Sequence, residues 1–505
     1  MRYRLFFSQL SSIRVTYSGL IAFIIGIISV FTGLVFVLIV TRQLSPEEFG
    51  TWSILGSMLS YFLISERVIS YWTTRQIARG EDVGKTSVIS SITFSFGAIP
   101  FYLILVYYVS AQSNANLEPM LLATILLPIY FISQTLFGIN TGHKPHATSY
   151  SLLVFEVFKI PVALLLVFWL DLGINGAITT VIIAYLLRIS IQFYFAKPKI
   201  KEKFNFQILR RWLKFSWIPI YSHIEKTIRT VDVLLYTLIT GSVIGVAYYT
   251  ASLTVAMVVS HSALITQALY PKLLARGSYA LIRENFILLM FFSIPLLGIA
   301  VIFAKPALFA LNPLYDEASL IVIILSFRTF VQILGGTFGK ILRGIEKVDV
   351  EKNPTFSSLT KSYLFFLPTV YNIQYGLYLA ILVPLLFFLV SVQTSEIEII
   401  TWWAIIGLVI EIPVVIFLAI KVKKETNFSF PIRNTVKYLF STLAFVTVFF
   451  LTSPHIIIYH QSIYDFMPTV IIQLVICVGV YIGITYLIDE KTRILFKSIL
   501  KELKQ

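Results

Sequence analysis

Charge is scarce in this sequence. Asp, Glu, Lys and Arg make up 13% of its 505 residues, whereas 57% of the residues are hydrophobic. A typical soluble domain carries about 25% charged residues. Together with a mean hydropathy of +0.84, this composition excludes an ordinary water-soluble globular protein and indicates a chain whose main solvent is lipid.

Cysteine and the motifs of catalysis are also scarce. The single cysteine, Cys477, lies inside an apolar run, so neither an intramolecular disulfide nor a zinc–thiolate site can be assembled. The six histidines show no metal-ligand spacing, and the sequence has no His-Glu-x-x-His pair or Gly-x-Ser-x-Gly turn. We therefore expect no enzyme, no metal site and no cofactor.

One stretch is similar to a phosphate-binding loop, Gly80–Thr86 (GEDVGKT). It is one residue short of the P-loop pattern, which also needs a preceding buried strand to aim its backbone amides. Here the stretch follows an apolar run and an arginine-containing turn, so we interpret it as an ordinary loop.

The net charge of +15 could suggest a nucleic-acid partner. That interpretation needs basic residues gathered on a soluble surface. In this chain the basic residues lie between long apolar runs instead, so we expect no nucleic-acid partner.

Those apolar runs predict an all-α polytopic membrane protein. A hydrocarbon core about 30 Å thick needs about 20 helical residues, and lipid allows no unpaired backbone groups, so such runs must be helices. We predict about fourteen spans, at residues 17–40, 51–69, 88–109, 120–137, 150–170, 173–195, 217–240, 244–269, 286–303, 318–334, 363–390, 399–420, 438–451 and 470–487.

The connections between the spans alternate in charge. Lys and Arg are retained on the cytoplasmic side of a membrane. Of the 40 Lys and Arg residues, only Arg42 and Lys305 fall in predicted outer loops. Predicted inner segments carry basic residues at 2–14, 67–85, 144, 197–214, 272–283, 340–361, 421–437 and 491–504. We therefore expect a multi-pass plasma-membrane protein with both termini in the cytoplasm.

The second span has a clear start signal. In Ser45-Pro46-Glu47-Glu48, a hydroxyl side chain precedes a first-turn proline and two acidic residues. This order supplies a cap for the free amides, a preset backbone angle and negative charge at the positive end of the helix dipole. The helix should therefore begin at Pro46, directly after a tight outer turn.

Charges inside spans are the candidate functional residues. A charge at the centre of a membrane helix costs at least about 2.5 kcal/mol, so it usually marks a cavity or a pathway. The seventh span carries a polar stripe at helical spacing. It consists of Ser222, Glu225, Arg229, Asp232 and Tyr236, with Lys226 beside it. We interpret the stripe as lining a substrate cavity; in the alternative, its charges only neutralise one another inside the bundle.

Other spans carry isolated charges. Arg328 has no acid nearby in sequence, so it faces either a cavity or a partner on another helix. Glu411 near Pro413 is a candidate to bind a coupling proton. Glu156 is a second candidate for ion coupling, or it simply pairs with Lys159 three residues later.

Three sequence stretches resemble those of Wzx-type polysaccharide flippases. They are Thr41–Gly50 after the first span, Val231–Leu235 leading to Val243–Ala251, and Ile341–Lys347 after the tenth span. Those flippases belong to the multidrug/oligosaccharidyl-lipid/polysaccharide exporter superfamily. A weak internal repeat, which aligns residues 48–53 with 243–248, is consistent with the duplicated halves found in many transporters.

The resemblance implies two parallel six-helix lobes around a central cavity. The predicted divisions are 1–196 for the N-terminal lobe, 197–215 for a cytoplasmic linker, 216–425 for the C-terminal lobe, and 426–505 for two added spans and a basic tail. The resemblance also implies transport of a polyprenyl-phosphate-linked glycan to the outer leaflet by alternating access. Membrane lipids and glycan-assembly enzymes are the expected partners. The sequence departs from the family pattern in its first span, since residues 17–40 carry no charge. This departure argues against a symmetric pair of cationic sites, one in each lobe.

Two other functions fit less well. A multidrug-type exporter of the same fold would favour acidic and aromatic residues in its cavity. A membrane-embedded glycan polymerase or glycosyltransferase would need a sizeable outer loop with catalytic side chains, whereas the predicted outer loops are short.

Overall fold

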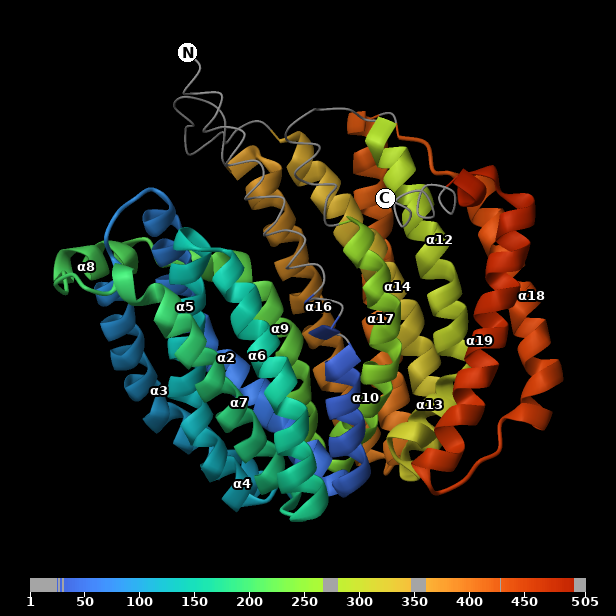
Figure 1. Ribbon diagram of the computed structural model, residues 1–505, viewed down its shortest axis with the longest axis horizontal. Helices are drawn as coiled ribbons and strands as arrows, with labels where there is room; N and C mark the ends of the chain where they lie inside the picture. The colour runs from blue at the N-terminus through green and yellow to red at the C-terminus, as the bar shows by residue number, and fades with distance from the viewer. Residues whose placement is uncertain are drawn as a thin grey trace. The chain divides into compact units, whose positions relative to one another are not determined.

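The computed structural model describes residues 25, 28–29, 31–266, 280–346, 360–426 and 428–494, apart from the side chains at 218, 222, 226, 280 and 281. Every element within these ranges is helical (Figure 1). The chain forms two compact units, Met1–Ala247 and Tyr248–Gln505.

The first unit is a helical bundle in which α2 packs against α3, α5 and α9, and α7 packs against α5 and α6. Its helices, after the segment Phe31–Gln43, are α2 Pro46–Ala78, α3 Gly84–Gln112, α4 Leu117–Leu122, η1 Ala123–Ile125, α5 Leu126–His143, α6 His146–Ala163, η2 Leu164–Trp169, α7 Gly173–Ala196, η3 Lys197–Lys199, α8 Phe206–Lys214 and α9 Trp217–Thr240.

The second unit pairs α14 with α17 and α18 with α19, and α12 packs against both α14 and α18. Its helices are α10 Ile244–Ala256, which begins in the first unit, η4 Met257–Thr266, α12 Ala280–Ile302, α13 Ala304–Leu311, η5 Pro313–Ala318, α14 Ser319–Ile345, α16 Tyr363–Ser391, α17 Glu396–Thr426, α18 Ile432–Ile456 and α19 Ile463–Ile488.

The helices confirm an all-α multi-pass membrane protein. Eleven helices within the described ranges are long and apolar enough to cross a membrane. The three remaining predicted spans also contain helix: Phe31–Gln43, α2 and α9. The last two carry charged residues, such as Glu66 in α2 and Arg229 in α9, which lower their hydropathy. The count of fourteen spans and the predicted lobe boundaries stay predictions.

The start of α2 is confirmed in detail. The Ser45 hydroxyl accepts a hydrogen bond from the Glu48 amide at 3.2 Å, and the Glu48 carboxylate accepts one from the Ser45 amide at 3.0 Å. Pro46 occupies the first turn. This reciprocal arrangement satisfies amides that would otherwise lack partners at the helix end. The other Glu48 oxygen accepts a hydrogen bond from the backbone amide of Ile174 at 3.1 Å, which connects the start of α7 to the start of α2.

Two short helices differ from the sequence prediction. The helices α8 and α13 lie in segments that we predicted only as loops; they are nine and eight residues long, too short to form a long apolar run.

The stretch that is similar to a phosphate-binding loop begins at Gly80, between α2 and α3, and α3 begins at Gly84. A helix therefore precedes this stretch, not the strand that a phosphate-binding loop needs.

Candidate functional site

The polar stripe of the seventh span lies on α9, whose ends match the predicted limits of 217 and 240. This helix packs along α2. The Tyr61 hydroxyl of α2 donates a hydrogen bond to the Thr230 carbonyl oxygen at 2.6 Å, and the hydroxyls of Ser60 and Thr230 are 3.4 Å apart. Polar contacts from α2 thus reach the middle of the stripe.

The stripe is partly buried. Asp232 and Tyr236 are buried in the first unit, whereas Glu225 and Arg229 are half-buried. One Asp232 oxygen accepts a hydrogen bond from the Val233 amide at 2.8 Å. The side chains of Ser222 and Lys226 lie outside the described part of the chain.

Glu156 and Lys159 form the predicted pair on α6, and hydroxyls from the first span join it. The Lys159 ammonium and the Glu156 carboxylate are 2.7 Å apart, and both side chains are buried. Ser29 and Thr32 donate hydrogen bonds to the two oxygens of Glu156, at 2.9 and 2.7 Å. The ammonium also lies 5.0 Å from the centre of the Phe36 ring, which adds a cation–π contact.

A buried acid that we did not predict lies on α2. Glu66 is fully buried, and one of its oxygens accepts a hydrogen bond from the Thr135 hydroxyl at 3.0 Å. Its second oxygen has no hydrogen-bond partner among the described residues. A signal was present, since an acid interrupts an apolar run, but the neighbouring Arg67 made the segment look like the start of a loop.

Arg328 lies in the interior of the second unit. Its guanidinium donates a hydrogen bond to the Tyr249 hydroxyl at 3.0 Å and lies 5.5 Å from the centre of the Tyr378 ring. The Tyr249 ring stacks in turn on Trp403 at 3.8 Å. Gly407 makes room for the cation, because a Cβ there would lie 2.6 Å from the guanidinium carbon.

Glu411 belongs to the same cluster, one helical turn beyond Gly407. It is buried and accepts hydrogen bonds from the Gln332 and Gln374 amides at 2.6 and 2.7 Å and from the Tyr375 hydroxyl at 3.0 Å. Its carboxylate interacts electrostatically with Arg328. The structure therefore brings together two residues that the sequence analysis had treated separately.

The partners of this cluster were missed, although a signal for them exists. Gln332 follows Arg328 by four residues, Tyr378 follows Gln374 by four, and Trp403 precedes Glu411 by eight. Spacings of four place residues on one face of a helix. Three apolar spans thus carry polar faces at helical spacing, which meet around the charged pair.

The sequence matches no known family model and no curated protein sequence. The fold is similar to solved structures. The lipid II flippase MurJ, in an inward closed conformation, has a TM-score of 0.65 at 16% identity, covering 95% of this chain and 100% of that chain.

Two MATE transporters are also similar. An inward-facing multidrug resistance MATE family transporter of the MOP superfamily has a TM-score of 0.60 at 14% identity, over 79% of this chain and 96% of that one. The Vibrio cholerae MATE transporter VcmN, in its bent form, has a TM-score of 0.51 at 12% identity, over 82% and 100%. The chain therefore has a MurJ/MATE-like fold, and these structural neighbours are transporters, not enzymes.

Proposed function

We propose that this protein moves a polyprenyl-phosphate-linked glycan precursor from the inner to the outer leaflet by alternating access. The observation that carries the proposal is the extent of the fold likeness. The lipid II flippase aligns with 95% of the chain, whereas the two MATE transporters align with 79% and 82%. The arrangement of a lipid-linked substrate flippase thus accounts for more of this protein than that of a multidrug exporter does.

Cationic residues on the predicted spans would supply the counter-charge that such a substrate needs. A lipid-linked diphosphate and its sugars cannot cross hydrocarbon unaided. Arginine binds phosphate oxygens with two parallel hydrogen bonds. We assign this role first to Arg229, supported by Lys226 and Ser222, with Glu225 and Asp232 orienting the guanidinium. Arg328 is a second candidate cation, in the other unit.

Glu411 and Glu156 are the candidates for ion coupling. Three donors surround Glu411, and an ammonium with two hydroxyls surrounds Glu156. A carboxyl oxygen that takes up a proton becomes a hydrogen-bond donor and can no longer accept all of these contacts. Uptake of a proton at either site would therefore require these contacts to rearrange, which links protonation to a movement of the surrounding helices.

A multidrug-type exporter is the second candidate function. It is favoured by the aromatic and acidic cluster of Tyr249, Trp403 and Glu411 in the second unit, because aromatic walls and a carboxylate suit an organic cation. Arg328 in the same cluster opposes that function, since it repels a cationic substrate.

A binding measurement separates the two functions. The purified full chain is titrated with a fluorescent lipid-linked oligosaccharide and, separately, with a fluorescent organic cation. The proposal predicts saturable binding of the glycolipid and at least about tenfold weaker binding of the cation. Tighter binding of the organic cation than of the glycolipid would favour the multidrug function and contradict the proposal.

A further inference from the structure

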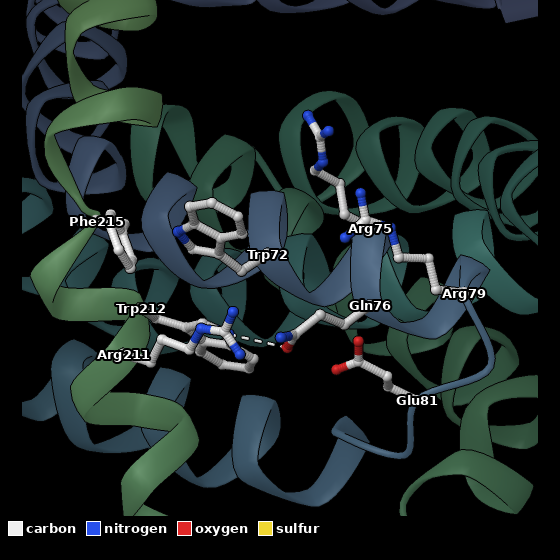
Figure 2. Close-up of a pocket in the computed structure, with 8 residues that line it drawn as sticks. All are labelled: Trp72, Arg75, Gln76, Arg79, Glu81, Arg211, Trp212 and Phe215. Carbon is white, nitrogen blue, oxygen red and sulfur yellow. Dashed lines mark hydrogen bonds between the residues drawn. The ribbon is translucent and has the colours of Figure 1, made fainter. Parts of the chain in front are cut away.

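A basic, aromatic-walled pocket lies in the first unit, away from the polar stripe of α9. It forms where the end of α2 faces α8 and the residue after it, as Figure 2 shows. Its volume is about 300 Å³, and it is lined by Trp72, Arg75, Gln76, Arg79, Glu81, Arg211, Trp212 and Phe215. Nothing in the proposed transport function uses these residues.

The length of α2 leads us to expect that its end extends beyond the membrane. With 33 residues and a rise of about 1.5 Å per residue, α2 is about 50 Å long, against a hydrocarbon core of about 30 Å. The predicted span ends near Ile69, so Trp72, Arg75 and Arg79 belong to the turns that leave the hydrocarbon. The charge alternation predicts that this is the cytoplasmic side.

The composition of α8 suits the membrane interface, and the helix lies directly before the span that begins at Trp217. It exposes Phe206 and Leu213 beside the basic residues Arg210, Arg211 and Lys214. Apolar and basic side chains on one short helix are typical of a segment that lies among lipid head groups.

α8 is also held firmly in place. The Trp212 indole is buried in an apolar cluster with residues of α2 and α5, and its N–H donates a hydrogen bond to the Gln76 oxygen at 2.9 Å, drawn as a dashed line in Figure 2. At the start of the helix, the backbone N–H of Asn205 donates a hydrogen bond to the Thr86 hydroxyl at 3.0 Å. The two walls of the pocket are therefore preformed.

The pocket carries an excess of positive charge. Three guanidinium groups line it, and Glu81 is the acid among the lining residues. Neither Arg79 nor Arg211 forms an ion pair with a described residue, and both are exposed. The Gln76 oxygen accepts from Trp212, which leaves the amide nitrogen of Gln76 as a further donor. This set of donors suits a phosphate group.

We propose that this pocket binds the phosphodiester head group of an anionic phospholipid of the cytoplasmic leaflet. Its volume lies at the lower end of small-molecule sites, which span about 300–1,000 Å³, and so suits a small head group better than an oligosaccharide. The arginines hold the phosphate, and Trp72 and Phe215 line the pocket beside them with the kind of aromatic side chain that is enriched at the membrane–water interface. The cytoplasmic leaflet contains anionic lipids, and its negative surface potential attracts basic protein segments next to the membrane.

The test is native mass spectrometry of the delipidated full chain, with phosphatidylglycerol or phosphatidylcholine of identical acyl chains added. The wild-type protein should retain phosphatidylglycerol over phosphatidylcholine. The double variant Arg79→Gln/Arg211→Gln should bind phosphatidylglycerol at least about tenfold more weakly, the loss expected for one charge-assisted hydrogen bond. The matched control Lys203→Gln/Arg210→Gln removes the same charge from the same surface, outside the pocket, and should bind as the wild type does.

A conservative double variant distinguishes loss of binding from misfolding. Arg79→Lys/Arg211→Lys keeps the charge but loses the bidentate geometry, and should fall between the wild type and the glutamine variant. Equal losses in the pocket variant and its control would show that only net charge matters and would overturn the proposal. So would equal retention of both lipids, or equally strong binding of soluble glycerol phosphate, which would make the site one for a free phosphate ester.

Discussion

Arg328 shows how a single buried charge is accommodated in this bundle. Its guanidinium contacts a tyrosine hydroxyl, lies over the Tyr378 ring and occupies space left open by Gly407, while Glu411 supplies negative charge nearby. An unpaired cation in a dry interior would cost several kcal/mol. The sequence predicted that Arg328 faces a cavity or a partner on another helix. It could not predict which partner, because four helices build the cluster.

Arg229 is the residue on which the proposed substrate contact depends most. Lysine in its place keeps the charge but loses the planar fork that binds phosphate with two hydrogen bonds. We predict that Arg229→Lys lowers the rate of glycolipid transport about tenfold or more, an effect of about 1.5–3 kcal/mol. The melting temperature in detergent should stay close to that of the wild type.

The control for this change is Arg283→Lys, which alters an exposed arginine at the start of α12 in the same way. It should transport at the wild-type rate. If Arg229→Lys and the double variant Glu225→Gln/Arg229→Gln both insert normally and transport at the original rate, the stripe on α9 is only structural.

At the scale of helices, the sequence was most informative about where the long elements lie. Every predicted span contains a described helix, and both limits of α9 agree. Long apolar runs fix such helices because lipid leaves the backbone no other partner. Short amphipathic helices such as α8 lack that constraint, and their stability comes from tertiary contacts such as that of Trp212 with Gln76.

The contact between α2 and the start of α10 depends on a glycine. A Cβ at Gly50 would overlap the Val243 carbonyl oxygen and lie 2.7 Å from its carbon, whereas a Cβ at Gly56, on the same helix, would meet nothing within 4 Å. We predict that Gly50→Ala destabilises the protein by about 1–3 kcal/mol. Gly56→Ala should be neutral or stabilising by up to about 1 kcal/mol. Thermal unfolding in detergent measures both, and equal effects would contradict the close approach.

α18 and α19 are joined by an acid just beyond the end of α19. Asp489 accepts hydrogen bonds from Asn434, Lys437 and Tyr438 of α18, at 3.2, 3.0 and 3.0 Å. Burial alone would raise its pKa, but hydrogen bonds from Lys437, Tyr438 and Thr492 hold the pKa of Asp489 below its usual value.

This depressed pKa makes the contact dependent on pH. The stabilisation is complete above the pKa of the unfolded chain, about 3.9, and is lost as the pH falls through the lower pKa of the folded state. We predict that Asp489→Asn costs about 1–3 kcal/mol at pH 7, and that the difference from wild type shrinks below about pH 4. Asp465→Asn, an exposed acid on α19, should cost little at either pH. A constant cost for Asp489→Asn down to pH 3 would contradict this assignment.

For the whole molecule, the charge alternation predicts an orientation that the fold does not determine. Cysteine labelling tests it in a Cys477→Ser background. Ser242→Cys, between α9 and α10, should react with a membrane-impermeant maleimide added outside intact cells. Lys203→Cys, between η3 and α8, should react only after the membrane is opened. The opposite result at either position would show that a span has been miscounted.

The central claim is that the protein transports a lipid-linked glycan, and transport in proteoliposomes tests it most directly. The purified chain is reconstituted with a fluorescent polyprenyl-diphosphate oligosaccharide, a fluorescent phospholipid or a fluorescent organic cation, and the appearance of each on the opposite side is followed. We predict that the protein accelerates movement of the glycolipid, does so more slowly in the Arg229→Lys variant, and leaves the other two unaffected. Transport of the organic cation without movement of the glycolipid would contradict the account.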